Sequence, residues 1–490
     1  MALEQLAGLK IYPNSEVELN GTLYFLAKDV RGKWLGILGD ATGFEGLRQG
    51  DLLLCPLTAA NAAALRARLP WLWPQPLGLR KSVGYGDRLG LATPGHVRAT
   101  RRFDLAPVFA QQSVRENTRT GRSPQQVLDD AMWGVFQEGW RNPWGADADH
   151  LKAIADLDAY LAAGYTLYTV DPGSYVDDEA HIAPPTKVKA KVRALPWEAL
   201  EDTEQDMERR YLGHVFDLGR LALSFDRETL WRAAAKYGHA IAHTASMYRY
   251  LLTTFPRLLT RPAQRGQEAE GRFELEISVD ETETPTSPQE HFFIASELRR
   301  LGVHWISLAL RYVGRFEKGV DYLGDLGEFE AEFSRHVAVA QALGPYKLSL
   351  HSGSDKFSLY PYIARHAGEL VHVKTAGTSY LAALRSIANV APGLFRQILR
   401  LACLRYPEDK ASYHVSADPA RLPRLEALAD SELASVLELF DGRQVLHVTF
   451  GSVLDQFGEE LKDVLTNHEE TYYAILEEHF IKHLAPFAGR

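Results

Sequence analysis

A histidine, a carboxylate and an ammonium group follow a short apolar stretch near residue 350. Lys347–Leu350 alternates polar and apolar side chains, which predicts a short strand with one wetter face. The residues that follow it are His351, Ser352, Gly353, Ser354, Asp355 and Lys356. Charged side chains are costly to bury, so this concentration of them indicates a functional loop. The alternative is a solvated loop with one buried, hydrogen-bonded histidine.

Similar groups of titratable residues recur where other predicted strands end. The further candidates are Asp149 and His150 after Trp144, Asp280 and Glu281 after the strand 273–279, and His372 and Lys374 at the end of the strand 370–373. Asp149 could instead cap the helix that follows it. The recurrence favours an active site that several strand ends build together.

Three of these residues, His150, His351 and His372, are histidines on different strands. Neutral imidazoles bind zinc, nickel, cobalt or manganese, and carboxylates complete such sites. We therefore predict that the three histidines bind one divalent metal ion, whose identity the sequence does not distinguish. His372 lies between Val371 and Val373 and could equally point outward. A helical pair, His239 and His243, offers a second metal site, but it lacks the glutamate that zinc proteases carry beside the first histidine. Two structural histidines are the simpler interpretation of that pair.

Alternating strands and helices must position these residues. Apolar strands with charged ends are expected near Ser82, Trp144, Tyr165, Phe273, His304, Lys347, Leu370 and Val445. Helices between most of them argue for a parallel sheet, and about eight such units close an α/β fold of the TIM-type (β/α)8 barrel class. Such barrels carry their chemistry at the carboxyl ends of the strands. A doubly wound open sheet is the alternative.

The chain divides into an extension and a barrel. Residues 1–79 predict a small mixed α/β N-terminal extension, and residues 80–490 predict the catalytic barrel. Residues 197–259 interrupt the alternation with two apolar stripes, Leu212–Leu223 and Leu230–Tyr248, which predict a helical insertion of two long helices. A single closing helix is expected from Leu461 to Phe480.

The composition limits the kinds of molecule that the protein is expected to bind and the compartment in which it is expected to act. A net charge of −9 provides no basic field for nucleic acid or an anionic membrane. The two cysteines, Cys55 and Cys403, form no disulfide framework and favour a reducing compartment. No apolar run has transmembrane length, and the first residues carry an early acid instead of a signal-peptide run. We expect a cytoplasmic protein that acts on a small molecule, with a homo-oligomer left open.

Five long segments together resemble the tagaturonate epimerase family. They are Gly145–Lys152, Val279–Thr282, Gly314–Asp321, Leu350–Phe357 and Lys374–Tyr380. The likeness covers most of the chain from about Gly84 onward, in the same order. It implies an enzyme that interconverts tagaturonate and fructuronate in hexuronate breakdown, similar in activity to enzymes that turn fructose into tagatose. It also implies a divalent metal ion and no organic cofactor.

Inversion at C4 requires a mechanism other than simple enolisation. The carbon to be inverted, C4 of the ketose, lies two bonds from the ketone, so its C–H is not acidic and enolisation cannot invert it. A retro-aldol route is our hypothesis: a metal ion stabilises an enediolate, the C3–C4 bond breaks, and the aldehyde rotates before the bond re-forms. Asp149 would be the base and Glu281 the acid. Asp149 and His150 could exchange roles, and Asp280 could replace Glu281.

The remaining charged and polar residues are predicted to bind a sugar or sugar-acid substrate. They are Arg88, Asp280, Arg315, Ser352, Asp355, Lys356 and Lys374. A metal-dependent sugar isomerase or aldolase would use the same groups, and only product analysis separates it from an epimerase. A non-catalytic carbohydrate-binding protein is a further alternative, although binding alone rarely needs so many titratable groups at strand ends.

Overall fold

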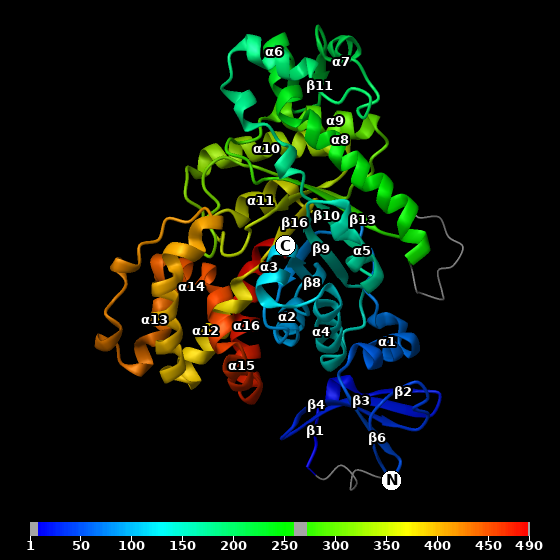
Figure 1. Cartoon of the computed structure of the whole chain (residues 1–490), viewed down its shortest axis with the longest axis vertical. Coiled ribbons are helices and arrows are strands. Elements are labelled where there is room, and N and C mark those ends of the chain that lie inside the picture. Colours follow the sequence, from blue (N-terminus) through cyan, green and yellow to red (C-terminus); the bar gives the residue numbers. More distant parts are fainter. Residues whose placement is uncertain (1–7, 259–271, 489–490) are drawn as a thin grey trace.

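Eight parallel strands form a closed barrel at the centre of the protein (Figure 1). The computed structural model describes residues 8–258 and 272–488. The order around the barrel is β10-β13-β14-β15-β16-β7-β8-β9, so the last barrel strand, β16, pairs with the first barrel strand, β7. The strands are β7 (Ser82–Gly86), β8 (Ala106–Ser113), β9 (Gly145–Leu151), β10 (Leu167–Val170), β13 (Glu274–Val279), β14 (Ser307–Leu310), β15 (Lys347–Leu350) and β16 (Val371–Lys374). The predicted (β/α)8 barrel is confirmed.

Helices follow the barrel strands and surround the barrel. They are α2 (Thr93–Thr100), α3 (Val114–Thr120), α4 (Pro124–Gln137), α5 (Ile154–Ala163), α9 (Pro288–Arg300), α10 (Leu326–Leu343), α11 (Tyr360–Ala367) and α12 (Thr378–Val390). Ser123 caps α4, because its hydroxyl accepts a hydrogen bond from the backbone N–H of Gln126 at 3.2 Å. The side-chain oxygen of Gln126 in turn accepts a hydrogen bond from the backbone N–H of Ser123, which completes a capping box.

The prediction of one barrel strand is wrong, because the segment is helical. The segment from Val445 to Phe450 lies in α14 (Phe440–Val448) and at the start of α15 (Phe450–Asn467), where its apolar residues pack among helices. The eighth strand is β8, which the sequence analysis missed. Pro107 concealed it, because a proline has no N–H to donate to a neighbouring strand. All of β8 is nevertheless buried, as expected for a parallel strand that is covered on both faces.

An antiparallel sheet and one helix form the N-terminal extension. The strands are β1 (Lys10–Ile11), β2 (Val17–Leu19), β3 (Thr22–Asp29), β4 (Gly32–Leu38), β5 (Leu47–Gln49) and β6 (Leu52–Pro56), followed by α1 (Ala59–Arg68). The sheet is tied to the far end of the chain through Glu469. The carboxylate of Glu469 lies 3.2 Å from Lys33 Nζ and 3.6 Å from Lys28 Nζ, and it accepts a hydrogen bond of 2.9 Å from the Tyr12 hydroxyl.

An insertion between β10 and β13 extends away from the N-terminal sheet (Figure 1). It contains α6 (Pro185–Arg193), α7 (Glu204–Tyr211), β11 (Val215–Asp217), β12 (Ala222–Ser224) and α8 (Arg227–Leu258), so it begins before residue 197. The expected second helix is α8. The expected first helix is wrong, because Leu212–Leu223 contains an antiparallel hairpin. Gly213 and Gly219 have φ values of 77° and 79°, which a right-handed helix does not permit.

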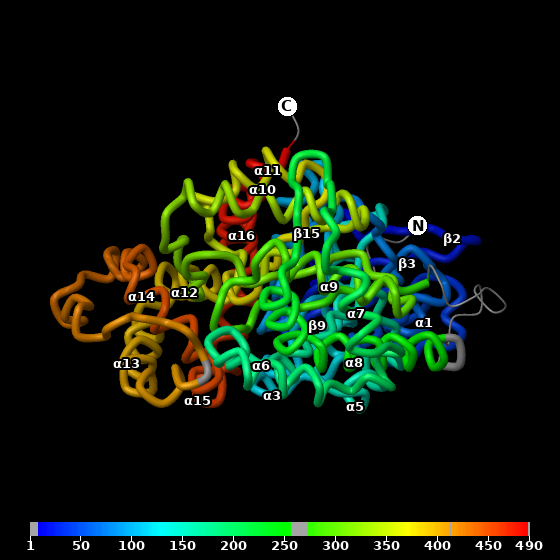
Figure 2. The backbone as a smooth tube through the Cα atoms, turned by 90° about the horizontal axis from the view of Figure 1, so that it is seen from above, coloured from blue at the N-terminus to red at the C-terminus, as the bar shows by residue number. Residues whose placement is uncertain are grey.

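The last quarter of the chain is helical. After α12 it contains α13 (Pro392–Asp409), α14, α15 and α16 (Glu469–Leu484). Figure 2 shows α13 and α14 on the side of the protein away from the N-terminal sheet. The single closing helix expected from Leu461 to Phe480 is in fact two helices, because His468 leaves the helical conformation between α15 and α16.

Helices long and apolar enough for a bilayer are absent from residues 8–258 and 272–488.

Candidate functional site

Polar side chains line the carboxyl end of the barrel interior. Residues two apart on a strand face the same side of the sheet, so alternation selects which of them point inward. The inward residues on or just after β13, β15 and β16 are Glu276, Ser278, Asp280, Ser349, His351, His372 and Lys374. Branched apolar residues normally fill such a barrel. The polar interior therefore marks this end of the barrel as a functional site.

A β-bulge at the end of β9 turns two adjacent residues toward this site. The pairing with β10 is regular at Ala148 and shifts before Leu151, so β9 carries one extra residue. His150 has a φ of 55°, a left-handed conformation that histidine adopts more readily than most residues. Neighbours on a regular strand face opposite sides, and the bulge explains how both Asp149 and His150 reach the same site.

The ammonium group of Lys374 lies among three buried carboxylates. Its Nζ is 2.8 Å from Asp147 Oδ2, 2.7 Å from Asp149 Oδ1 and 2.8 Å from Glu276 Oε1, and it donates to Thr169 Oγ1 at 2.7 Å. Burial lowers the pKa of Lys374, but the three carboxylates outweigh burial and hold this pKa well above its usual value. Lys374 is therefore a permanent cation that links β9, β13 and β16.

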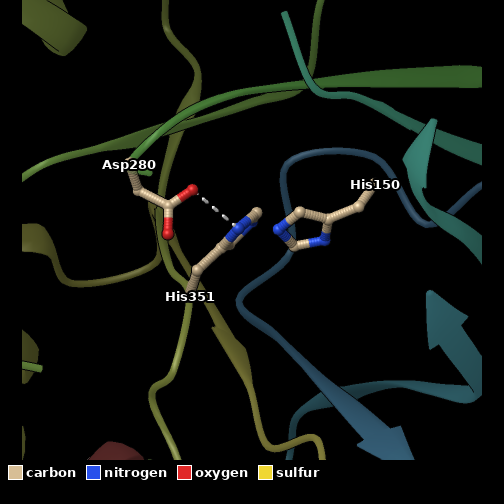
Figure 3. A group of neighbouring side chains, drawn as sticks. All are labelled: His150, Asp280 and His351. Carbon is tan, nitrogen blue, oxygen red and sulfur yellow. Dashed lines mark ion pairs between the residues drawn. The ribbon is translucent and has the colours of Figure 1, made fainter. Parts of the chain in front are cut away.

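Two imidazoles and one carboxylate lie side by side next to this ionic network (Figure 3). Ligand atoms of His150, Asp280 and His351 all lie within 4.8 Å of one another. His351 Nδ1 is 3.1 Å from Asp280 Oδ1, and His351 Nε2 is 2.6 Å from Glu276 Oε1. His150 Nδ1 is 2.8 Å from Asp149 Oδ1. Each imidazole is thus held on one nitrogen by a buried carboxylate that also contacts Lys374.

These donors fit a divalent metal ion. Two imidazole nitrogens and a carboxylate oxygen are common ligands of zinc, nickel, cobalt and manganese. Histidines that bind metal usually contact a carboxylate through their other nitrogen, which fixes the ring and its tautomer. Asp149 and Glu276 stand in that position behind His150 and His351. Nε2 of His150 forms no hydrogen bond within the described part of the chain, so it can accept a metal ion.

The electrostatic field of the group also favours a cation. Burial lowers the pKa of His351, but the Asp280 carboxylate outweighs burial and raises the pKa to about 10. The pKa of His150 is raised in the same way, against burial, by Asp149. Burial raises the pKa of Asp280, but His351 outweighs burial and holds this pKa well below its usual range. A site that attracts protons onto its histidines has a negative potential, and that potential attracts a metal ion as well.

His372, the third histidine of the predicted metal site, lies apart from this group. Its Nδ1 is 2.8 Å from Ser82 Oγ on the neighbouring strand, and burial lowers the pKa of its imidazole to about 3. Asp280, which we had predicted to bind substrate, occupies the position beside His150 and His351 that we expected for His372.

A cavity of about 240 Å³ opens beside Asp280 and His351, and a smaller cavity of about 30 Å³ adjoins it beside Asp149 and His150. The side chains that line both are Arg115, Lys318, His351, Ser352 and Tyr413. Glu281, the predicted acid, borders the larger cavity and is partly exposed. Burial raises the pKa of Glu281, but the positive charges of His150, Lys318 and Arg115 together outweigh burial and lower this pKa.

Two of the predicted substrate-binding arginines border these cavities but have protein partners. The guanidinium of Arg88 donates to Glu116 Oε1 at 2.9 Å and to the carbonyl oxygen of His447 at 3.0 Å. It also stacks 3.7 Å from the centre of the Phe450 ring. Arg315 lies on the exposed rim, 3.6 Å from Glu317. Ser352, which also borders the cavities, has a left-handed backbone with a φ of 51°.

Asp355 and Lys356 line neither of these cavities. Asp355 pairs with Arg443 Nη2 at 2.8 Å and His479 Nε2 at 3.2 Å, which joins the loop after β15 to the C-terminal helices. Lys356 donates to the carbonyl oxygens of Glu317 at 2.9 Å and Val320 at 2.5 Å. Both side chains therefore hold loops in place around the barrel.

The helical histidine pair of the insertion forms no such group. Nε2 of His243 lies 3.0 Å from the carbonyl oxygen of Lys152, and its ring stacks on Tyr175 with 4.0 Å between ring centres. His239 is exposed. Neither residue belongs to a cluster with metal-binding spacing in the described residues. The structural interpretation of this pair agrees with these contacts.

Three residues at the site were missed by the sequence analysis: Glu276, Arg115 and Lys318. Glu276 had a signal, because it shares the inward alternation of β13 with Ser278 and Asp280. Arg115 follows the unrecognised strand β8, and its position could not be placed without that strand. Lys318 belongs to a charged loop after β14, where sequence alone does not tell which side chain points toward the barrel.

Known proteins match this chain over nearly its whole length. A family model described as tagaturonate epimerase matches residues 12–487. A tagaturonate/fructuronate epimerase from Thermotoga maritima is 43% identical over 492 residues, which cover 98% of each chain.

Solved structures match over the same length. The native crystal structure of a fructuronate-tagaturonate epimerase from Cohnella laeviribosi has a TM-score of 0.91 and 37% identity, and the match covers 99% of this chain and 98% of that one. A structure of the same protein with one glycerol gives the same TM-score and identity. With matches that span nearly its whole length, the chain belongs to the tagaturonate epimerase family and is an epimerase, an enzyme of the isomerase class.

Proposed function

We propose that this enzyme interconverts tagaturonate and fructuronate by inverting C4, and that it does so with a divalent metal ion. The observation that carries the proposal is the group formed by His150, Asp280 and His351 at the carboxyl end of a tagaturonate epimerase barrel. Fructose and tagatose are the uncharged counterparts of this pair, and we propose them as poorer substrates.

His150, His351 and Asp280 are the proposed metal ligands, in place of the earlier set that included His372. Asp149 and Glu276 would fix the two imidazoles from behind, and Lys374 would hold both carboxylates in position. When bound, a metal ion supplies Lewis-acid polarisation of the ketone and its neighbouring hydroxyl.

Asp149 is the proposed base. Its Oδ1 is engaged by His150 and Lys374, whereas within the described residues Oδ2 has one partner, Gln111 Nε2, at 3.4 Å. Oδ2 therefore has free acceptor capacity beside the small cavity. In the proposed route it takes the proton of the C4 hydroxyl while the C3–C4 bond breaks. The electron pair of that bond passes to the ketone-bearing fragment, and C4 becomes an aldehyde carbon that can rotate.

Glu281 is the proposed acid that protonates the C4 oxygen after the C3–C4 bond has re-formed on the other face. The lowered pKa of Glu281 favours its ionised form. Glu281 must therefore take up a proton from solvent before it donates one, and its side chain is 36% exposed, which permits that uptake. In the reverse direction Glu281 would accept the proton and Asp149 would supply it.

The test is product analysis by NMR. Enzyme loaded with zinc, nickel, cobalt or manganese in turn is incubated with fructuronate. We expect tagaturonate to accumulate without three-carbon fragments, EDTA to stop the reaction, and one or more of these metals to restore it.

The same experiment tests the alternatives. Free three-carbon products would favour an aldolase, and an aldose product would favour a sugar isomerase. Turnover that EDTA leaves intact would contradict the metal site. Cytoplasmic location, homo-oligomer formation and the domain boundary between residues 79 and 80 stay predictions.

A further inference from the structure

Two cationic side chains at the carboxyl end of the barrel are not neutralised by a close carboxylate of the protein. Four of the cations that border the two cavities are already engaged by protein groups. They are Arg88 with Glu116, Arg311 with the carbonyl oxygens of Tyr312 and Gly314, Arg315 with Glu317, and Lys374 with three carboxylates. Arg115 and Lys318 remain.

Arg115 is held in place without being neutralised. Its guanidinium stacks over Tyr413 with 5.0 Å to the ring centre, and its closest carboxylate, Glu281, is 3.9 Å away. Its Nε is buried and donates to no atom in the described residues. A buried guanidinium nitrogen without an acceptor is costly, so a ligand oxygen at this position would satisfy it.

Lys318 is a second cation, without an ion-pair partner in the described residues, and it lies beside Arg115. Its ammonium has no ion pair and no hydrogen bond to any residue that the structure describes, and it borders both cavities together with Arg115. Burial lowers the pKa of Lys318, and the positive charge of Arg115 lowers it further. An anion placed between these two adjacent cations would stabilise both charges.

We propose that Arg115 and Lys318 bind the carboxylate of the keto-uronate and so select it over a neutral ketose. This inference rests on the proposed function. A keto-uronate has one carboxylate, at the opposite end of the molecule from its ketone. With the ketone end beside His150, Asp280 and His351, the carboxylate end lies toward the cations that border the same cavities. A neutral ketose offers a hydroxyl there and leaves both cations unneutralised.

The test compares Lys318→Met, Lys318→Arg and Arg115→Met in the metal-loaded enzyme, with Lys462→Met on the distant helix α15 as the control for net charge. For fructuronate we expect kcat/KM to fall about 10- to 100-fold in each methionine variant, as for the loss of a charged hydrogen bond. Lys318→Arg keeps the charge and should retain most of the activity, and Lys462→Met should match the parent enzyme.

A binding measurement makes the test independent of turnover. Calorimetry with gluconate, a six-carbon carboxylate, and with sorbitol, its uncharged analogue, should show that Lys318→Met weakens gluconate binding about 10-fold or more and leaves sorbitol binding unchanged. Equal losses for both compounds, no loss for gluconate, or equal losses in Lys318→Arg and Lys318→Met would overturn the carboxylate site. A parent enzyme that fails to epimerise fructuronate would overturn the proposed function instead.

Discussion

Two carboxylates, Asp149 and Glu276, each contact a histidine and Lys374 through one and the same oxygen atom. This arrangement couples the orientation of both imidazoles to a single buried cation. Carboxylates behind metal-binding histidines commonly change metal affinity by 10- to 100-fold when they are replaced. The ionic network is therefore expected to change the metal affinity of the proposed site without supplying a metal ligand.

Replacement of His351 by alanine tests the site directly. His351 contributes a ligand atom and is buried between Asp280 and Glu276. We expect His351→Ala to lose bound metal, measured by mass spectrometry of the purified protein, and to lower kcat at least about 100-fold. The exposed His239 provides the control, and His239→Ala should keep both. Full metal content and activity in His351→Ala would refute the proposed ligand set.

Replacement of Glu276 by glutamine tests the position behind His351. The amide keeps the size of the side chain but removes its charge, while Asp147 and Asp149 still neutralise Lys374. We expect the dissociation constant of the metal, measured by competition with a chelator, to rise about 10- to 100-fold. An unchanged constant would mean that Glu276 serves only to neutralise Lys374.

At this scale the sequence identified the types of residue better than their positions. His150, His351 and Asp280 were recognised from their places after strands, and the structure brings them together. Asp355 and Lys356 are immediate neighbours of that site in sequence, but their backbone turns them toward other loops. A β-bulge such as the one before His150 has no reliable signal in a single sequence, because it depends on pairing with the next strand.

At the scale of elements, most strands of the barrel could be predicted because parallel barrel strands are short apolar runs between helices. The failures have local causes. The strand β8 was not predicted because it contains a proline near its start. The segment around Val445 was predicted to be a strand because it contains β-branched residues, but it lies in a buried helix. In the insertion, an apolar stripe with helical spacing belongs to a hairpin, since two glycines with left-handed backbone break any helix there.

A pair of buried histidines between α9 and α10 predicts acid sensitivity. Nδ1 of His291 and Nδ1 of His336 lie 3.1 Å apart, and Tyr346 contacts Nε2 of His291 at 2.7 Å. Burial lowers the pKa of His336 to about 3, and burial together with His336 lowers the pKa of His291 well below its usual value. Between about pH 6.5 and pH 3 these two histidines are therefore protonated in the unfolded chain but not in the folded protein.

The free energy of unfolding should accordingly fall as the pH drops below about 6.5, by up to about 1.4 kcal/mol per pH unit for each such histidine. Urea unfolding between pH 4 and pH 7 measures this slope. His336→Asn should have a shallower slope than the parent protein, and the exposed His181→Asn should not. Identical slopes in all three proteins would show that the histidine pair does not contribute.

At the scale of the whole molecule, one carboxylate joins the two ends of the chain. Glu469 of α16 contacts Lys28, Lys33 and Tyr12 of the N-terminal extension. Loss of its charge leaves two mostly buried ammonium groups without the carboxylate that neutralises them. Glu469→Gln should lower the free energy of unfolding by about 2 kcal/mol, as for the loss of a hydrogen bond to a charged group, measured by urea unfolding.

The adjacent Glu470 is the matched control. Its side chain is 59% exposed and pairs with Arg98, so Glu470→Gln is expected to cost less than about 1 kcal/mol. Equal effects of the two substitutions would argue that the extension is held by apolar packing alone.

The order of the site residues along the chain constrains when the proposed metal site can form during synthesis. His150 leaves the ribosome long before Asp280 and His351, and Lys374 comes last of all. Until β16 emerges, nothing closes the cylinder against β7, and three neighbouring acids have no counterion. A polypeptide that ends before β16 therefore lacks the formed site, and the proposed ion could bind there only after β16 has been synthesised.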